Sequence, residues 1–332
     1  MTLLTSEQYK QDLLAQLKMA KHRIAIASMV LYYEDGMTEI FTALKNALDR
    51  GVIVAIVVDS YNNFLFTEGS NLFKLVSYRH RIRATRQAFA ELREHGATIT
   101  EVGSVGPNPY KRRFHYKCVV VDDVVYFAGG VNMTRLSFEQ TDYMLRTQNT
   151  QFADDLVRHL SDIATNGKQS DTTLYIDQNN TLFIDSGAPD KSIIYDRAVA
   201  LSKQAESIVY VSQLAPSGPL ASLLRQKNAV LYFNRPAQLS FPASLDQYLS
   251  AWQYRQPNSY QGEDFIHAKY MLFTLPGDKK IALSGSHNFS YRGVQYGTKE
   301  LALEATSPAV WNELQQFTNR RIATRSSYDQ KI

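Results

Sequence analysis

The chain has 332 residues, of which 44% are hydrophobic and 20% charged, so it is long enough for two domains and has the balance of a globular protein. A single cysteine, Cys118, excludes an intrachain disulfide framework and a cysteine-built metal site. The net charge of +4 is mild, so anion binding has to depend on local clusters of basic residues. No apolar run approaches the roughly 20 residues of a membrane span. The polar start lacks a signal-peptide pattern, and we expect a cytoplasmic protein.

Helix and strand patterns alternate through the first half of the chain. Apolar residues at helical spacing predict helices, and continuous apolar runs predict strands that are buried on both faces. The predicted helices cover 6–22, 37–50, 64–95 and 151–165, and the predicted strands cover 24–30, 52–59 and 98–103. This alternation predicts an α/β fold with mostly parallel sheets flanked by helices.

The same order returns after a polar linker at 166–171. Residues 20–28 align with 205–212, and both segments lead through helix and strand patterns toward similar motifs. A repeat of about 150 residues is too long for a solenoid, so we predict a duplicated domain with halves at 1–168 and 169–332. The elements predicted in the second half are a hairpin at 172–185, helices at 195–204 and 219–227, strands at 207–212 and 229–233, and a helix after Ser307-Pro308.

Two short strings carry the candidate chemistry, and in each a histidine stands two residues before a lysine on a predicted strand. Side chains two apart in a strand point the same way, so His115 shares a face with Lys117, and His267 shares one with Lys269. A glycine-containing turn with an asparagine follows each string. The turns are Gly129-Gly130-Val131-Asn132 and Gly285-Ser286-His287-Asn288.

An acidic residue follows each turn, Asp142 in the first half and Glu300 in the second. These residue types suit phosphodiester chemistry without a metal. One imidazole can attack phosphorus as a nucleophile, while the other releases the leaving oxygen as a general acid. A carboxylate on the second ring nitrogen fixes the histidine tautomer, and Asp142 and Glu300 are the candidates for that role.

A bound phosphodiester also needs fixed donors that neutralise its charge. Both halves offer candidates for this phosphate-binding set: Lys117, Lys269, Asn132, Asn288, Ser286 and the turn at Gly130. Only a pseudo-twofold pairing of the halves brings both sets together. We therefore predict one active site shared at their interface, which needs no dimer for catalysis.

The string His115-x-Lys117-x4-Asp122 and the turn that ends at Asn132 resemble the HKD signature of the phospholipase D superfamily. The resemblance implies transphosphatidylation or hydrolysis through a phosphohistidine, without metal or cofactor, in two α/β halves that share one site. It implies His115 as nucleophile and His267 as general acid and base, or the reverse, and a structural role for Asp122. The second string departs from this pattern, because Thr274 stands where the aspartate is expected.

That second string, with Pro276-Gly277 and the segment from Gly285 to Val294, resembles the second motif of eukaryotic-type phosphatidylglycerophosphate synthases. Cardiolipin synthases are related in mechanism. The resemblance implies transfer of a phosphatidyl group from CDP-diacylglycerol, or another anionic phospholipid, by an enzyme bound peripherally to the inner membrane face.

Basic clusters suit anionic headgroups or a nucleotide pyrophosphate, and they suit a nucleic-acid backbone equally well. The clusters are Lys74, Arg79, Arg81, Arg83 and Arg86, and Lys111-Arg112-Arg113. One alternative function is therefore a hydrolase, either a phospholipase D or a nuclease, because histidine and lysine do not decide whether water or an alcohol accepts the phosphoryl group. The other alternative is a binding protein that has kept the fold, against which two intact sets of His, Lys and Asn argue.

Overall fold

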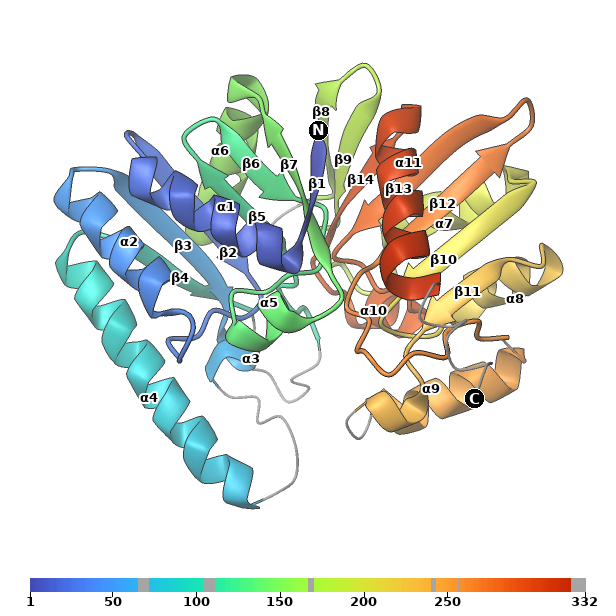
Figure 1. The fold of residues 1–332 in the computed structure, drawn as a ribbon, viewed down its shortest axis with the longest axis horizontal. Coiled ribbons are helices and arrows are strands. Elements are labelled where there is room, and N and C mark those ends of the chain that lie inside the picture. Colours follow the sequence, from blue (N-terminus) through green and yellow to red (C-terminus); the bar gives the residue numbers. More distant parts are fainter. Residues whose placement is uncertain (65–71, 104–110, 167–169, 240–242, 256, 324–332) are drawn as a thin grey trace.

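The computed structural model describes residues 1–64, 72–103, 111–166, 170–239, 243–255 and 257–323, which form two seven-stranded sheets (Figure 1). The first sheet has the order β1-β7-β6-β5-β2-β3-β4. Its strands are β1 (Thr2–Thr5), β2 (Arg23–Ser28), β3 (Ile53–Asp59), β4 (Thr98–Val102), β5 (Lys117–Val121), β6 (Val124–Phe127) and β7 (Tyr143–Gln148).

The second sheet has the order β11-β10-β12-β13-β14-β9-β8. Its strands are β8 (Thr172–Asp177), β9 (Asn180–Ile184), β10 (Ser207–Ser212), β11 (Val230–Phe233), β12 (Tyr270–Leu275), β13 (Lys279–Gly285) and β14 (Leu301–Ala305). The hairpin predicted at 172–185 is confirmed as the β8–β9 pair.

The α/β class with two halves is confirmed, but the prediction of mostly parallel sheets is wrong. Among the described strand pairs, β2–β3, β3–β4 and β10–β11 are parallel. The other pairs are antiparallel. All five residues of β5 are buried, although both of its neighbours run antiparallel to it. A continuous apolar run therefore indicates that both faces of a strand are covered, and it does not indicate the direction of the neighbouring strand.

The two sheets repeat one arrangement. In the first, β2 lies between the parallel strand β3 and the antiparallel strand β5. In the second, β10 lies between the parallel strand β11 and the antiparallel strand β12. Since β2 and β10 are the strands within the aligned segments, the predicted internal repeat is confirmed at this level.

Helices cover the outer faces of the sheets (Figure 1). The first, α1, begins after Thr5, whose side chain accepts from the Gln8 N–H as the N-cap. Sequence patterns missed the four-residue strand β1 and helix α9. The helices are α1 (Ser6–Met19), α2 (Thr38–Asp49), α3 (Ser60–Phe64), α4 (Leu72–Glu94), α5 (Arg135–Glu139), α6 (Thr150–Asn166), α7 (Ile193–Gln204), α8 (Gly218–Gln226), α9 (Ala243–Tyr254), α10 (Tyr291–Tyr296) and α11 (Pro308–Phe317), with a 3₁₀ turn at Pro236–Gln238 and a π-helical turn at Thr318–Ala323.

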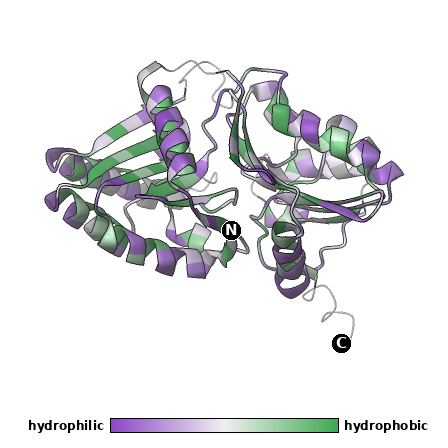
Figure 2. Cartoon of the chain, turned by 90° about the horizontal axis from the view of Figure 1, so that it is seen from above, coloured by the Kyte–Doolittle hydropathy of each residue, from purple (hydrophilic) through white to green (hydrophobic). Residues whose placement is uncertain are grey.

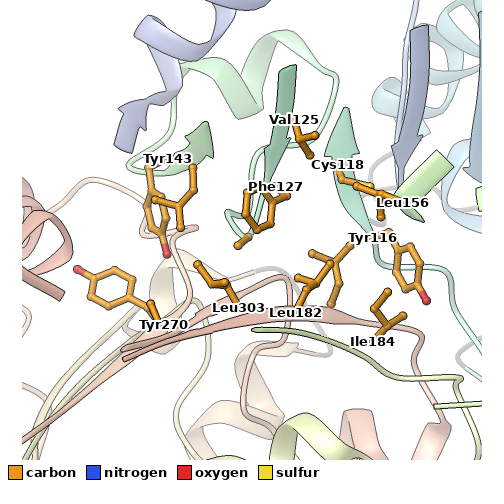
Figure 3. Packing of buried hydrophobic residues seen from close by; sticks show 14 of the residues in the cluster. Tyr116, Cys118, Val125, Phe127, Tyr143, Leu156, Leu182, Ile184, Tyr270 and Leu303 are labelled. Atoms are coloured by element: carbon orange, nitrogen blue, oxygen red, sulfur yellow. The ribbon is translucent and has the colours of Figure 1, made fainter. Parts of the chain in front are cut away.

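The halves share one hydrophobic core, in which Tyr116 and Phe127 of the first half pack with Leu182 and Leu303 of the second (Figure 3). Apolar residues concentrate on the strands, and polar residues lie along the helices outside them (Figure 2). Because the core is continuous across the halves, their relative position is held by packing. The exact boundary at residue 168 remains a prediction.

Candidate active site

His115 lies in the extended segment that leads into β5, and it is held by residues of the other half. Its backbone N–H donates to the Lys299 carbonyl at 2.9 Å. Its ring Nδ1 lies 2.8 Å from Oε2 of Glu300. The histidine of the first half is thus oriented by a carboxylate 185 residues away.

His267 has the reciprocal arrangement, in the segment that leads into β12. Its backbone N–H donates to the Thr141 carbonyl at 3.0 Å, and Nδ1 lies 2.7 Å from Oδ2 of Asp142. The sequence predicted that Asp142 and Glu300 orient the histidines. The structure adds that each carboxylate contacts the histidine of the opposite half.

Burial lowers the pKa of both imidazoles. For His115 the charge of Lys117 adds to the effect of burial, and Glu300 opposes it. For His267 burial and the charge of Lys269 lower the pKa to about 4, against the opposing effect of Asp142. Each ring is therefore neutral at pH 7, and its Nδ1–H donates a hydrogen bond to the carboxylate. That tautomer leaves a lone pair on Nε2, the nitrogen that can attack phosphorus.

The two lysines are buried beside their histidines. Lys117 Nζ donates to the His115 carbonyl at 3.0 Å, and Lys269 Nζ donates to the His267 carbonyl. Burial, followed by the charge of Lys269, lowers the pKa of Lys117 to about 7. Burial also lowers the pKa of Lys269 to about 8, although Asp142 and Glu300 oppose the shift. Because groups from both halves act on each lysine, the two sets occupy a single electrostatic site.

The turns before the two carboxylates support them in different ways. The Gly130 N–H donates to Asp142 Oδ1 at 3.1 Å, and a Cβ at Gly130 would stand 2.5 Å from Asp142 Oδ2, so only glycine fits. Ser286 is fully buried, and its hydroxyl bonds the Glu300 carboxylate. The Ser286 hydroxyl thus bonds the carboxylate that contacts His115, and its place in the phosphate-binding set stays a prediction.

The asparagines of the two turns have different surroundings. Asn132 is buried, and its Oδ1 has no hydrogen-bond partner among the described residues. Asn288 lines a cavity of about 240 Å³ together with His115, Glu300 and Arg113. Such a cavity beside reactive histidines is where a small polar group of a substrate can bind.

Asp122, for which the resemblance implies a structural role, binds the loop before β2. Its carboxylate accepts the backbone N–H groups of Lys21, His22 and Arg23 at 2.8–3.0 Å. Burial by itself would raise the pKa of Asp122, but these three donors hold it below its usual value. In the second half Thr274 offers only its backbone carbonyl to the equivalent loop, at 2.8 Å from the Glu206 nitrogen.

Sequence reasoning missed Asp59, which supports the segment that carries His115. Asp59, at the end of β3, accepts the Phe114 N–H at 2.8 Å and forms an ion pair with Arg113 at 3.1 Å. An aspartate that ends an apolar strand is the signal that could have found it. Arg113 is thus neutralised in part, and Arg81 of the first basic cluster pairs with Glu34 at 3.6 Å. The Lys74 side chain lies outside the described residues.

Comparison with known proteins agrees with this geometry. Residues 13–164 match the family model described as "Cardiolipin synthase, PLD-like domain". A search of curated protein sequences finds no match. The match covers the first half of the chain, with the HKD string at His115, and identifies it as a domain of the phospholipase D superfamily; the second half repeats its strand arrangement around a second His-x-Lys string.

Solved structures with the same fold come from proteins of several functions. The phosphatidylserine synthase of Haemophilus influenzae Rd KW20 superposes with a TM-score of 0.70 at 13% identity, over 98% of this chain and 88% of that one. The polyphosphate kinase of Porphyromonas gingivalis gives 0.61 at 13% identity, over 95% of this chain and 46% of that one. Yeast tyrosyl-DNA phosphodiesterase gives 0.50 at 12% identity, over 92% and 89%. At these identities the likeness shows the fold alone.

The described residues offer neither a metal centre nor a membrane-spanning helix. Within the described ranges, no three His, Cys, Asp or Glu side chains are grouped so that they could hold a metal ion. None of the helices in that part of the chain is both long and apolar enough to cross a bilayer.

Proposed function

We propose that this protein is a phosphatidyltransferase of phospholipid biosynthesis, similar to phosphatidylglycerophosphate and cardiolipin synthases, that acts through a phosphohistidine. The observation that carries the proposal is the crossed pairing of His115 with Glu300 and of His267 with Asp142. It gives each imidazole a fixed tautomer and a free Nε2 in one shared site.

In the first step Nε2 of His115 attacks the phosphorus of CDP-diacylglycerol or another anionic phospholipid. A P–N bond forms, the P–O bond to the leaving group breaks, and the leaving oxygen takes a proton from His267. The negative substrate raises the pKa of His267 from its low resting value, so that the ring is protonated when it is needed. Lys117, Lys269, Asn132 and Asn288 hold the phosphoryl oxygens.

In the second step His267, now neutral, removes the proton of an acceptor hydroxyl. The acceptor oxygen attacks phosphorus, the P–N bond breaks, and His115 returns to its neutral form. The roles of the two histidines exchange if the covalent adduct forms on His267. Trapping the adduct with a slow substrate and mapping it by mass spectrometry identifies the nucleophile.

Helix α9 supports a lipid rather than a nucleic acid as substrate. Leu245, Tyr248, Leu249 and Trp252 follow each other at helical spacing and are exposed by 49, 60, 49 and 72%. Aliphatic residues mixed with Tyr and Trp are typical of helices that lie at the bilayer surface. The exposed Arg255 directly after the helix suits anionic headgroups.

The opposite face of α9 is connected to the active site. Gln247 accepts the Ala215 N–H at 2.9 Å and donates to the Asn234 carbonyl. Asn234 in turn binds both the N–H and the carbonyl of Ile266, at 2.8 and 2.7 Å. Ile266 directly precedes His267, so a bilayer in contact with α9 would lie close to the reacting groups.

The test is an incubation with CDP-diacylglycerol, glycerol 3-phosphate and phosphatidylglycerol in the presence of a chelator, with products identified by mass spectrometry. A phosphatidyl product is expected. Release of phosphatidic acid alone would show that the protein hydrolyses the phosphodiester and does not transfer the phosphatidyl group. Cleavage of single-stranded DNA or RNA, with binding that falls steeply with salt, would make the protein a nuclease.

Membrane contact is tested separately by co-sedimentation with phosphatidylglycerol vesicles. Leu249→Ser combined with Trp252→Ser is expected to abolish binding. Tyr175→Ser is the matched control, since Tyr175 is 76% exposed on β8, far from α9 in the fold (Figure 1). Equal vesicle binding by both variants would remove α9 as the docking surface.

A further inference from the structure

His287 is a polar side chain in the active-site cavity to which the reaction above assigns no role. The residue is only 3% exposed, yet it lines the same cavity as His115, Glu300 and Asn288. Burial, opposed only in part by Glu300, lowers the pKa of His287 to about 4, so the imidazole is neutral at pH 7.

The turn that carries His287 fixes its tautomer. Nδ1 accepts the Phe289 N–H at 2.8 Å, and the proton of the neutral ring is therefore on Nε2. Phe289 adopts a φ of +52°, a conformation that a non-glycine residue rarely takes and that the surrounding structure has to stabilise. Among the described residues no group hydrogen-bonds Nε2–H, and because His287 lines the cavity this donor is open to a ligand there.

The first half has no equivalent of this donor. Val131 occupies the matching position of its turn, and it is buried in the apolar core of that half. The Met133 N–H, which matches that of Phe289, donates to the Val30 carbonyl at 3.1 Å instead. The pseudo-symmetry of the active site is therefore broken on the side where the cavity lies.

The other residues around the cavity favour an anion. Arg113 and Arg292 line it, together with hydroxyl and amide groups of Ser290, Thr298 and Asn62. Among the described residues Glu300 is the carboxylate in this lining, and His115 and Ser286 both hydrogen-bond its Oε2. A ligand oxygen here would meet guanidinium, hydroxyl and amide donors from both halves of the chain.

We propose that this cavity is a binding subsite for a second oxyanion of the substrate, and that the Nε2–H of His287 is its anchoring donor. The oxyanion is a phosphate group, carried either by a phosphorylated acceptor alcohol or by a leaving nucleotide. The subsite rests on the proposed function, because it is defined by its position beside a phosphodiester bound at His115. It explains how an otherwise symmetric site distinguishes one end of its substrate.

The test uses His287→Asn in the full-length protein. The asparagine Oδ1 can still accept the Phe289 N–H, so the turn is kept while the donor at the position of Nε2 is lost. His287→Gln, which can return an N–H to the cavity, is the rescue variant. The probes are glycerol 3-phosphate for the acceptor, CMP for the nucleotide and glycerol as the uncharged comparison, with binding measured by calorimetry and melting temperatures recorded for both variants.

Loss of a hydrogen bond to a charged group predicts that His287→Asn weakens binding of at least one phosphate probe by about tenfold or more. Glycerol binding should change by much less, and His287→Gln should recover part of the loss. Whichever probe responds identifies the source of the phosphate. Equal affinities in the wild type and His287→Asn would overturn the subsite, even if phosphatidyl transfer is observed. Tight binding of the probes without any phosphatidyl transfer would reject the proposed function and leave the subsite standing.

Discussion

The two halves use different side chains to place a carboxylate against a histidine. In the first half a glycine, Gly130, lets the short carboxylate of Asp142 approach the turn and reach His267. In the second half the longer Glu300 reaches His115, and the hydroxyl of Ser286 fills the space behind it. One half combines a small turn residue with a short carboxylate, and the other combines a larger turn residue with a longer carboxylate. The contact between carboxylate and imidazole is the same in both.

The difference extends to the periphery of the site. The first half has Asp122 to hold its loop and Val131 in its core, whereas the second half has Thr274 and His287 at these positions. The histidines, lysines and carboxylates are therefore arranged symmetrically, and the surrounding residues are not. In the proposed mechanism the symmetric groups act in both steps, and in the proposed subsite the asymmetric groups bind one end of the substrate.

The largest effect is expected where the halves are alike. His115→Asn and His267→Asn should each lower kcat for phosphatidyl transfer by about 10³-fold or more, because each step needs both imidazoles. Steady-state kinetics with circular dichroism as a folding control measures this. A variant at either position that keeps full activity would refute the shared site.

The carboxylates test the crossed pairing. Asp142→Asn and Glu300→Gln should each lower kcat by about 10- to 100-fold, as is typical when the partner that orients a histidine is changed. If the pairing is crossed, Asp142→Asn should shift the ring nitrogen NMR signals of His267 and leave those of His115 largely unchanged. The reverse pattern would assign each carboxylate to its own half.

Exchanging the turn residues tests the compensation between bulk and length. Gly130→Ser should lower the free energy of unfolding by about 1–3 kcal/mol, because the new side chain meets Asp142 and the His267 carbonyl. Ser286→Gly should cost less, about 1 kcal/mol for one lost hydrogen bond. Urea denaturation compares them, and equal costs would show that the two turns are interchangeable.

The loop contacts of Asp122 predict a difference in stability rather than in catalysis. Asp122→Ala removes the carboxylate that accepts three backbone N–H groups and should cost about 1–2 kcal/mol of unfolding free energy with little change in kcat. Thr274→Val, at the matching position, should stay within about 0.5 kcal/mol. A large loss of activity in Asp122→Ala with unchanged stability would point to a direct catalytic role instead.

The pH dependence of stability tests His287, the turn residue that has no counterpart in the first half. The pKa of His287 falls from 6.5 in the unfolded chain to about 4 in the folded protein, so between these values the unfolded state binds more protons. Stability should therefore fall as pH drops from 6.5 toward 4. His287→Asn should flatten this slope by at most about 1.4 kcal/mol per pH unit. An unchanged slope would mean that His287 is protonated in the folded protein.

Much of the candidate active site could be read from the sequence, because its signals are local. His115 and Lys117, and likewise His267 and Lys269, lie two residues apart, and the turns that follow repeat in the same order. Resemblance to the HKD signature then implied the two halves and one shared site. Strand direction could not be predicted in this way, since the buried runs of β5 and β12 show only that both faces are covered.

The sequence by itself determined which residue types are present and which neighbours share a face. Only the tertiary structure decided that Glu300 serves His115 and Asp142 serves His267, that Ser286 lies behind a carboxylate, and that His287 faces the cavity. The physical reason is separation along the chain. The carboxylate–imidazole contacts join residues that are 125 and 185 positions apart in the sequence. These residues are brought together by the core shared between the two sheets, which no local sequence pattern records.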